Sequence, residues 1–306
     1  MRLIATFCLM LGVTVAVANP ITLYVGYAAG GLADRLSRLA ASELSKELQR
    51  PVNVRNLTGA NGLRAAKEIL QQGEKEIHLL FADSSLLIAH EVAKQQDVDP
   101  WKFLPVGSFG VTPFALVVPT SLPVVSTPDL IRYLNDHPEQ ASFGSPGMYS
   151  VHQLGVTFLL KQAKTSAQHI PYQGGIQMLS DLLAGRLTFG MLSVHLADQY
   201  VQSGDLRVVG VTGRRRIDMW PDTPTISDSF PGVQAVSSAY LLASPKTPPD
   251  VHEKIVKAWS KIIGQRHLIQ QLESFGMEGP AVTSTDMEKL MRSEQYFLKN
   301  MLRQLK

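Results

Sequence analysis

The stretch Ile21–Arg38, ITLYVGYAAGGLADRLSR, joins a run of β-forming residues to a pair of glycines and then to the start of a periodic helix. From Leu32 onward, leucines recur at helical spacing, which predicts an amphipathic helix directly after the glycines. A strand, a short loop and a helix in this order form the repeating unit of parallel α/β sheets. Because loops at the carboxyl ends of parallel strands point into the ligand crevice, we expect this loop to lie at a binding site.

Gly30 and Gly31 precede the first helical turn, where backbone N–H groups lack partners within the helix and carry a partial positive charge. Without a Cβ in the way, an anion can reach these groups, so the pair is consistent with an anion site as well as with a simple tight turn. Asp34, on the same turn, either favours the helix dipole or meets a ligand ammonium. The stretch is neither a dinucleotide fingerprint nor a P-loop, because the third glycine and the Gly-Lys-Ser/Thr ending are missing.

Two further loops repeat this arrangement between an expected strand and an expected helix. Residues 143–152, FGSPGMYSVH, combine a glycine, serine and proline loop with a helix start at which Ser150 is the N-cap. Residues 168–175, QHIPYQGG, again end in two glycines before a helix. Three loops of this kind favour an anion site more strongly than any one of them does.

Strand-like and helix-like segments alternate along the chain, which predicts an α/β fold with mostly parallel sheets. Stretches that contain prolines, at 113–123 and 221–231, bracket a middle section. We therefore expect a discontinuous first domain, residues 19–120 plus 235–306, and a continuous second domain, residues 121–234. A cleft between two such domains suits hinge closure around a ligand.

The first residues, 1–18, read as a secretory signal peptide, since Arg2 is followed by an apolar run and by small residues up to Ala18, after which we expect the cut. The run is too short to span a membrane comfortably, so we expect export to the periplasm. The single cysteine, Cys8, would leave with this segment, which excludes disulfides and thiolate metal sites from the mature chain. A formal net charge of only +3 argues against nucleic-acid binding.

Signals of catalysis are weak in this sequence. It contains no Gly-x-Ser-x-Gly or His-Glu-x-x-His motif, and its 8 histidines form no close pair of the kind that binds zinc. We therefore expect no metal, no cofactor and no enzymatic activity. Ser145 with His152 or His169 as its base would make a Ser/His hydrolase, the weakest alternative, because a serine in a Gly-Ser-Pro turn more often serves a turn or hydrogen-bonding role.

These loops, together with shorter stretches and in this order, resemble the Bug (TctC-like) family of periplasmic solute receptors of tripartite tricarboxylate transporters. The resemblance covers nearly all of the chain after the signal peptide. Each motif is loose, but their ordered set is specific. The stretches that carry it are 27–38, 52–62 (VNVRNLTGANG), 143–154, 169–185 (HIPYQGGIQMLSDLLAG), 204–207 (GDLR), 220–225 (WPDTPT) and 243–248 (ASPKTP).

The resemblance implies a two-domain Venus flytrap that closes on a small carboxylate and presents it to membrane transporter subunits, without catalysis. The alternative is a periplasmic sensing module that docks on a sensor kinase, and we expect a monomer. The ligand class stays open between dicarboxylates, tricarboxylates, aromatic acids and acidic amino acids. Carried over by position, the implied ligand-binding residues are Tyr27, Gly30, Gly31, Asp34, Asp83, Ser84, Ser85, Ser145, Gly147, Ser150, His152, Tyr172 and Gly174.

Several positions at the expected site depart from the family pattern. Tyr149 and Asn61 stand where glycines are usual. Ala28 and Ala29 stand where prolines are common, which predicts a more flexible first loop. Asp83 replaces a small neutral residue, so it would repel a second carboxylate but would welcome an amine.

Overall fold

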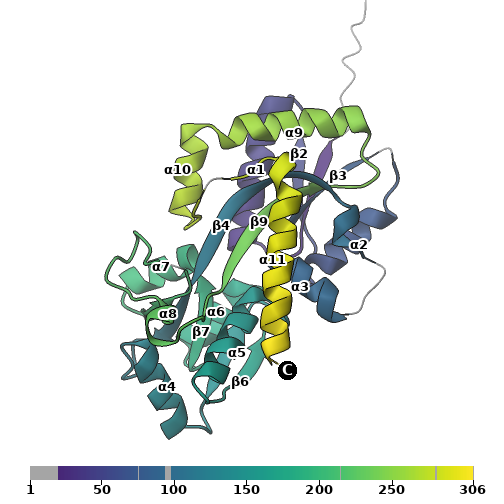
Figure 1. Ribbon diagram of the computed structural model, residues 1–306. Coiled ribbons are helices and arrows are strands. Elements are labelled where there is room, and N and C mark those ends of the chain that lie inside the picture. The colour runs from purple at the N-terminus through teal and green to yellow at the C-terminus, as the bar shows by residue number, and fades with distance from the viewer. Residues whose placement is uncertain (1–19, 75, 94–97, 214, 280, 306) are drawn as a thin grey trace, which may run out of the picture.

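In the computed structural model, the described residues form a 9-stranded sheet with helices on both faces (Figure 1). These residues are 20–74, 76–93, 98–213, 215–279 and 281–305. The expected signal peptide, with Cys8 and the cut after Ala18, lies outside them. None of the helices formed by the described residues combines the length and the apolar character that a membrane crossing requires.

The first half of the sheet contains five strands. In spatial order they are β2 (Val52–Asn56), β1 (Ile21–Val25), β3 (Ile77–Asp83), β9 (Val236–Ala243) and the first part of β4 (Leu104–Pro119). The first three strands pair in parallel, whereas β9 runs antiparallel to both β3 and β4. The expected strand, glycine loop and helix unit therefore lies at β1, next to the centre of this half.

The second half of the sheet is built around the remainder of β4. Its other strands are β7 (Phe189–Ser193), β5 (Ser142–Ser145), β6 (Gln168–Pro171) and β8 (Leu206–Val211). Strands β7, β5 and β6 pair in parallel, and β7 and β8 pair antiparallel with β4. The α/β class is confirmed, with the parallel strands gathered within each half and antiparallel strands between them.

Strand β4 is the element on which both halves meet. The sequence suggests two separate strands here, near 106–109 and 114–118, and this expectation is wrong because the chain runs through both without a break. Residues 104–113 pair with β9, and from Phe114 the same strand pairs with β7. Pro113 is tolerated inside a central strand because it is the last residue paired with β9, where that ladder ends.

Helices enclose a hydrophobic core on each face of each half, with α1 and α9 opposite α2 and α3 in the first half, and α4 and α5 opposite α6 and α7 in the second. The α-helices are α1 (Leu32–Leu48), α2 (Leu63–Gln71), α3 (Ser84–Ala93), α4 (Thr127–Asp136), α5 (Val151–Gln162), α6 (Gly175–Leu183), α7 (Val194–Gln202), α8 (Ile226–Ser229), α9 (Pro249–Ile263), α10 (Arg266–Ser274) and α11 (Ser284–Leu305). Two short 3₁₀ turns are η1 (Ala60–Gly62) and η2 (Pro100–Lys102). This burial of apolar faces on both sides of the sheet is the main stabilising contribution to the fold.

The C-terminal helix α11 runs along both halves and packs against α3, α5 and β4 (Figure 1, yellow). Its Glu294 carboxylate accepts a hydrogen bond from the Ser84 hydroxyl at 2.6 Å, and further ones from the hydroxyls of Ser238 and Tyr240. Burial raises the pKa of Glu294, although these hydroxyls oppose the shift. Ser84, which the resemblance places at the ligand, therefore anchors α11 instead of facing the cavity.

Candidate functional site

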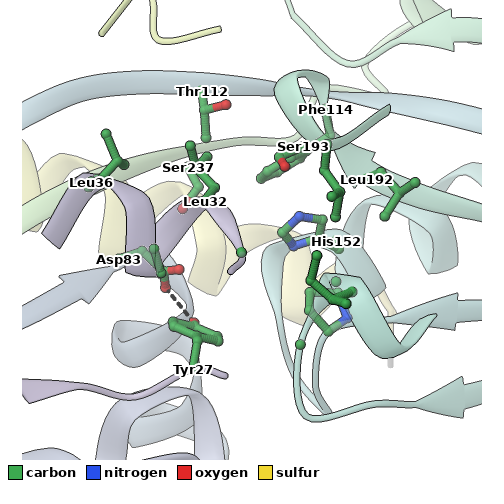
Figure 2. Close-up of a pocket in the computed structure, with 18 of the residues that line it drawn as sticks. Tyr27, Leu32, Leu36, Asp83, Thr112, Phe114, His152, Leu192, Ser193 and Ser237 are labelled. Carbon is green, nitrogen blue, oxygen red and sulfur yellow. Dashed lines mark hydrogen bonds between the residues drawn. The ribbon is translucent and has the colours of Figure 1, made fainter. Parts of the chain in front are cut away.

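A cavity of about 90 Å³ lies between the two halves of the sheet and is lined by residues from both. The first half contributes the loop after β1, the start of α1 and the end of β3. The second contributes the starts of α6 and α7 and part of α5, and residues of β4 and β9 complete the wall (Figure 2). Of the residues expected at the site, those that line this cavity are Tyr27, Gly31, Asp83, His152 and Gly174.

Three helices begin at the cavity without an N-terminal side-chain cap. Gly31 is the N-cap residue of α1, Gly174 that of α6 and Ser193 that of α7, and none of them makes a side-chain capping hydrogen bond. Helix α5, by contrast, is capped by Ser150, whose Oγ accepts from the Gln153 N–H at 3.2 Å. The open first turns of the three helices, with their positive dipole ends, favour an anion in the cavity.

Asp34 fastens the first loop and does not line the cavity. Its Oδ2 accepts from the Gly30 N–H and from Arg38 Nε, both at 2.9 Å, and its Oδ1 accepts from Asn56 Nδ2 at 3.0 Å. Burial by itself would raise the pKa of Asp34, but these hydrogen bonds and the Arg38 charge outweigh it and lower the pKa. The Gly30 N–H is therefore already in use, and Gly31 is the glycine of the pair that faces the cavity.

Asp83 and Tyr27 form a hydrogen-bonded pair on the cavity wall (Figure 2). The Tyr27 hydroxyl donates to Asp83 Oδ1 at 3.0 Å, and the Ser85 N–H donates to the same oxygen at 2.8 Å. Burial raises the pKa of Asp83 to about 6, against the lowering effect of both hydrogen bonds. A carboxyl group that changes charge near neutral pH thus faces the cavity.

The Asp83 shift predicts a dependence of stability on pH. The pKa of this carboxyl is about 6 in the folded state against 3.8 in the unfolded state. Its contribution to stability is fully present below pH 3.8 and is lost as the pH rises through 6. We expect wild type to lose about 2 kcal/mol relative to Asp83→Asn between about pH 4 and pH 7. Urea unfolding of both proteins across this range measures the difference, and a constant difference would contradict the prediction.

His152 and Ser237 line the cavity, and each carries a buried polar atom without a partner among the described residues. Among the described residues, neither His152 Nδ1 nor Ser237 Oγ has a hydrogen-bond partner, although both atoms are buried. Burial lowers the pKa of His152 to about 3, so the imidazole is neutral at physiological pH, and its ring packs on Phe114 with 3.8 Å between centroids. Buried polar atoms are normally paired, so these two are candidate ligand contacts.

The other expected residues make contacts away from the cavity. Ser85 Oγ accepts from the Val151 N–H at 3.2 Å, which ties the start of α3 to the start of α5. Tyr172 donates its hydroxyl hydrogen to Asp181 at 2.7 Å, and this contact contributes to a pKa of Tyr172 raised, first of all by burial, to about 12. These residues position the surrounding elements and do not line the site themselves.

Ser145 and His169 lie in hydrogen-bonding contact, with 2.7 Å between Oγ and Nε2. The pair has the geometry of a nucleophile and its base, but Ser145 is fully buried, and its Oγ also donates to the Gly147 carbonyl oxygen at 2.8 Å. Neither residue lines the cavity, and in the described part of the chain no carboxylate contacts His169. A catalytic serine needs access to substrate and a base that a third group orients. Ser145 and His169 have neither in this arrangement, and their contact instead holds the turn at residues 145–147.

Loops from the two halves touch each other beside the cavity. Asn61 Nδ2 donates to the Met148 carbonyl oxygen at 2.6 Å, and the Thr58 hydroxyl donates to Gln173 Oε1 at 3.2 Å. A Cβ on Gly147 would lie 2.4 Å from Asn61 Oδ1, so a larger residue there would have to displace the Asn61 side chain from its contact with Met148. The structure therefore has the two halves in direct contact around the site.

A family model described as tripartite tricarboxylate transporter family receptor, TctC, matches residues 36–306. The chain belongs to this family. The resemblance seen in the sequence is thereby confirmed.

Known relatives of this TctC-family chain agree in sequence and in fold. BugT of Bordetella pertussis is 27% identical over 263 residues, which are 84% of this chain and 77% of that protein. The structure of the periplasmic binding protein BugD superimposes with a TM-score of 0.86 at 21% identity, covering 94% of this chain and 97% of that one. The R. palustris protein Rpa4515 with adipate has a TM-score of 0.89 at 24% identity and the same coverage. The expected periplasmic-binding-protein architecture is confirmed.

Two departures of this TctC-family chain from the family motifs lie at left-handed backbone positions. Tyr149 has φ +61° and Asn61 has φ +50°, the region that favours glycine. The chain thus keeps the backbone shape of a glycine loop with other residues. Asparagine tolerates this conformation better than tyrosine, and Asn61 uses its side chain for the contact with Met148.

Some residues that line the cavity of this TctC-family chain were missed from the sequence. Ser193 is the last residue of β7 and the N-cap of α7, so the strand-end rule that singled out Gly31 would have found it. Thr112 lies within β4, the strand that runs through both halves, and Ser237 lies within β9, which pairs with β4. No local pattern marks them, because their place at the cavity depends on tertiary pairing.

Proposed function

We propose that the chain is a periplasmic solute-binding protein that captures a small carboxylate between two domains, without catalysis, and delivers it to a tripartite tricarboxylate-type transporter. The domains are residues 19–120 with 235–306, and residues 121–234. The ligand-binding residues are those that line the cavity, with Tyr27, Gly31, Asp83, His152 and Gly174 among them. No metal or cofactor takes part in this proposal.

The observation that carries the proposal is the meeting of three uncapped helix starts at one cavity. A carboxylate has two oxygens, each of which accepts hydrogen bonds from backbone N–H groups, and the three dipoles favour its charge. Helix α1 belongs to the first half and α6 and α7 to the second. A ligand that contacts both halves is held most strongly when they are together.

The same geometry supports closure between the domains. The contacts of Asn61 with Met148 and of Thr58 with Gln173 join loops that belong to different domains. A ligand that makes contacts available only in the closed form shifts the population of molecules toward that form. Strands β4 and β9 are the connections about which such a motion would turn.

The comparisons support this function without specifying the ligand. Membership of the receptor family favours solute capture, the fold matches that of BugD, and Rpa4515 holds adipate, a carboxylate. The sensing alternative uses the same cavity and differs only in its partner. Recovery of transporter subunits with the tagged protein from membranes would support delivery, and recovery of a sensor kinase would support the alternative.

The test of ligand capture is a thermal-shift screen of protein refolded from denaturant, which removes any bound ligand. A compound that binds the folded form alone raises the melting temperature with its concentration. We expect a saturable rise with carboxylates, drawn from di- and tricarboxylates, aliphatic and aromatic acids and amino acids, and none with matched neutral amides. The radius of gyration from small-angle scattering should fall at saturation. No rise with any carboxylate would refute capture, and a rise without compaction would refute closure.

A further inference from the structure

The walls of the cavity are mostly apolar. Leu32, Leu36 and Leu192 all line the cavity, and Figure 2 shows Leu32 above the space between Asp83 and His152, with Leu36 further left and Leu192 further right. A ligand that fills this space must present carbon to these surfaces, because burial of charge against them is unfavourable. The apolar side chains of the wall include Leu32, Leu36, Phe81, Phe114, Met191 and Leu192.

Basic side chains are missing from this wall. Among the described residues that line the cavity, none is lysine or arginine. The arginines of α1 have other partners, since Arg38 pairs with Asp34 and Arg35 Nε donates to the Gly30 carbonyl oxygen at 3.4 Å. One carboxylate can use the open helix starts, but a second one finds no opposite charge.

Asp83 gives the cavity wall a fixed acidic group. The Tyr27 hydroxyl and the Ser85 N–H hold its Oδ1 at 3.0 and 2.8 Å, so the side chain is kept in place on the wall. Glu294, on α11, acts on it as a further negative charge. A ligand carboxylate placed beside Asp83 would therefore be repelled.

Ser237 and His152 add an uncharged hydrogen-bonding position. Ser237 is only 4% exposed, and its Oγ lacks a partner, as does His152 Nδ1. Figure 2 shows Ser237 beside Leu32, above and to the left of His152. A hydroxyl can donate or accept and a neutral imidazole has one donor and one acceptor nitrogen, so both suit a hydroxyl, carbonyl or amide group of a ligand.

We infer that the ligand is a monocarboxylate with an apolar body and one uncharged polar group, and that Asp83 rejects ligands that carry a second carboxylate. The inference rests on the proposed function, because it takes this cavity to be the carboxylate site. It sets the chain apart from Rpa4515, since adipate has a carboxylate at each end.

The test compares acids that share one carbon chain and differ at the far end. Calorimetric titration at about pH 7.5 would use hexanoate, 6-hydroxyhexanoate, adipate and 6-aminohexanoate. We expect the hydroxy acid to bind most tightly and adipate at least about tenfold more weakly than hexanoate, since a repulsive element separates them. Equal or tighter binding of adipate overturns the inference. Tightest binding of the amino acid overturns the uncharged polar group of the ligand but not the rejection of a second carboxylate, because Asp83 would then pair with an ammonium.

A rigid series repeats the comparison, so that chain flexibility does not decide the result. It consists of benzoate, 4-hydroxybenzoate, terephthalate and 4-(aminomethyl)benzoate. If neither series binds but dicarboxylates or tricarboxylates raise the melting temperature, the inference is wrong and the proposed function stands. If no carboxylate of any class raises it, the proposed function itself fails.

Variants assign the effect to single side chains. Asp83→Asn keeps an acceptor for the Ser85 N–H and removes the charge, so the preference for hexanoate over adipate should fall at least about tenfold. Ser237→Ala should remove the advantage of the hydroxy acid over hexanoate. The control, Asp250→Asn on the exposed start of α9, should keep both ratios. An unchanged acid preference in Asp83→Asn overturns the role of Asp83.

Discussion

Replacing Gly31 by valine is expected to lower carboxylate affinity at least about a hundredfold, the equivalent of losing one or two charge-assisted hydrogen bonds. Gly31 is the N-cap of α1 and lines the cavity, so a branched side chain there would occupy the path to the open N–H groups. Its φ of −75° and ψ of 175° suit any residue. The nearest atom to a Cβ at this position would be the Ala28 carbonyl oxygen at 3.9 Å, so the variant should fold.

The matched control for this change is Gly73→Val, in the loop after α2. A Cβ on Gly73 would meet no atom within 4 Å, so the control adds the same side chain away from the cavity. Calorimetric titration of both variants with a carboxylate that stabilises wild type gives the comparison. Wild-type affinity in a folded Gly31→Val protein would show that the start of α1 does not hold the ligand.

Replacing Glu294 by alanine is expected to lower the free energy of unfolding by about 3–5 kcal/mol. The carboxylate accepts hydrogen bonds from Ser84, Ser238 and Tyr240, and its loss would leave these three hydroxyls without an acceptor in a buried region. The same contact attaches α11 to β9 and to the start of α3. Urea unfolding measures the loss.

Glu288→Ala, on the same helix, is the control for the Glu294 variant. Glu288 is 59% exposed in its side chain, and its ion-pair partner among the described residues is Arg292 at 2.6 Å, so its removal should cost no more than about 0.5 kcal/mol. Both changes remove a glutamate from α11 and alter the helix propensity equally. Similar losses in the two variants would show that the buried network does not hold the helix.

The fold could be predicted from local patterns because its units are local. The stretch Ile21–Arg38 forms β1, the glycine loop and the start of α1 as its residues indicate, and similar units recur at Phe143 and Gln168. The continuity of β4 could not be predicted, because Pro113 reads as a break unless the change of pairing partners is known. The rule that proline interrupts a central strand assumes that the strand keeps the same neighbours along its length, and β4 changes its neighbour at Pro113.

The cavity-lining residues that could be predicted from the sequence are those at or near the junction between a β-strand and the helix that follows it. Gly31, Asp83 and Gly174 follow or end strands and line the cavity. Ser84 has the same kind of position, but its hydroxyl bonds Glu294, which is 210 residues away along the chain. Contacts at such separations leave no trace in the spacing of residues, and this is also why Ser237 was missed.

The attachment of the first loop by Asp34 has a consequence for the thermodynamics of binding. Alanines 28 and 29 leave this loop freer in the unfolded chain than prolines would, so its conformational entropy is lost mainly when the protein folds. Asp34, held by Arg38 and Asn56, then keeps the loop ordered before any ligand arrives. The entropic cost of ordering this loop then falls on folding, where the lack of prolines lowers stability, and less of it falls on binding.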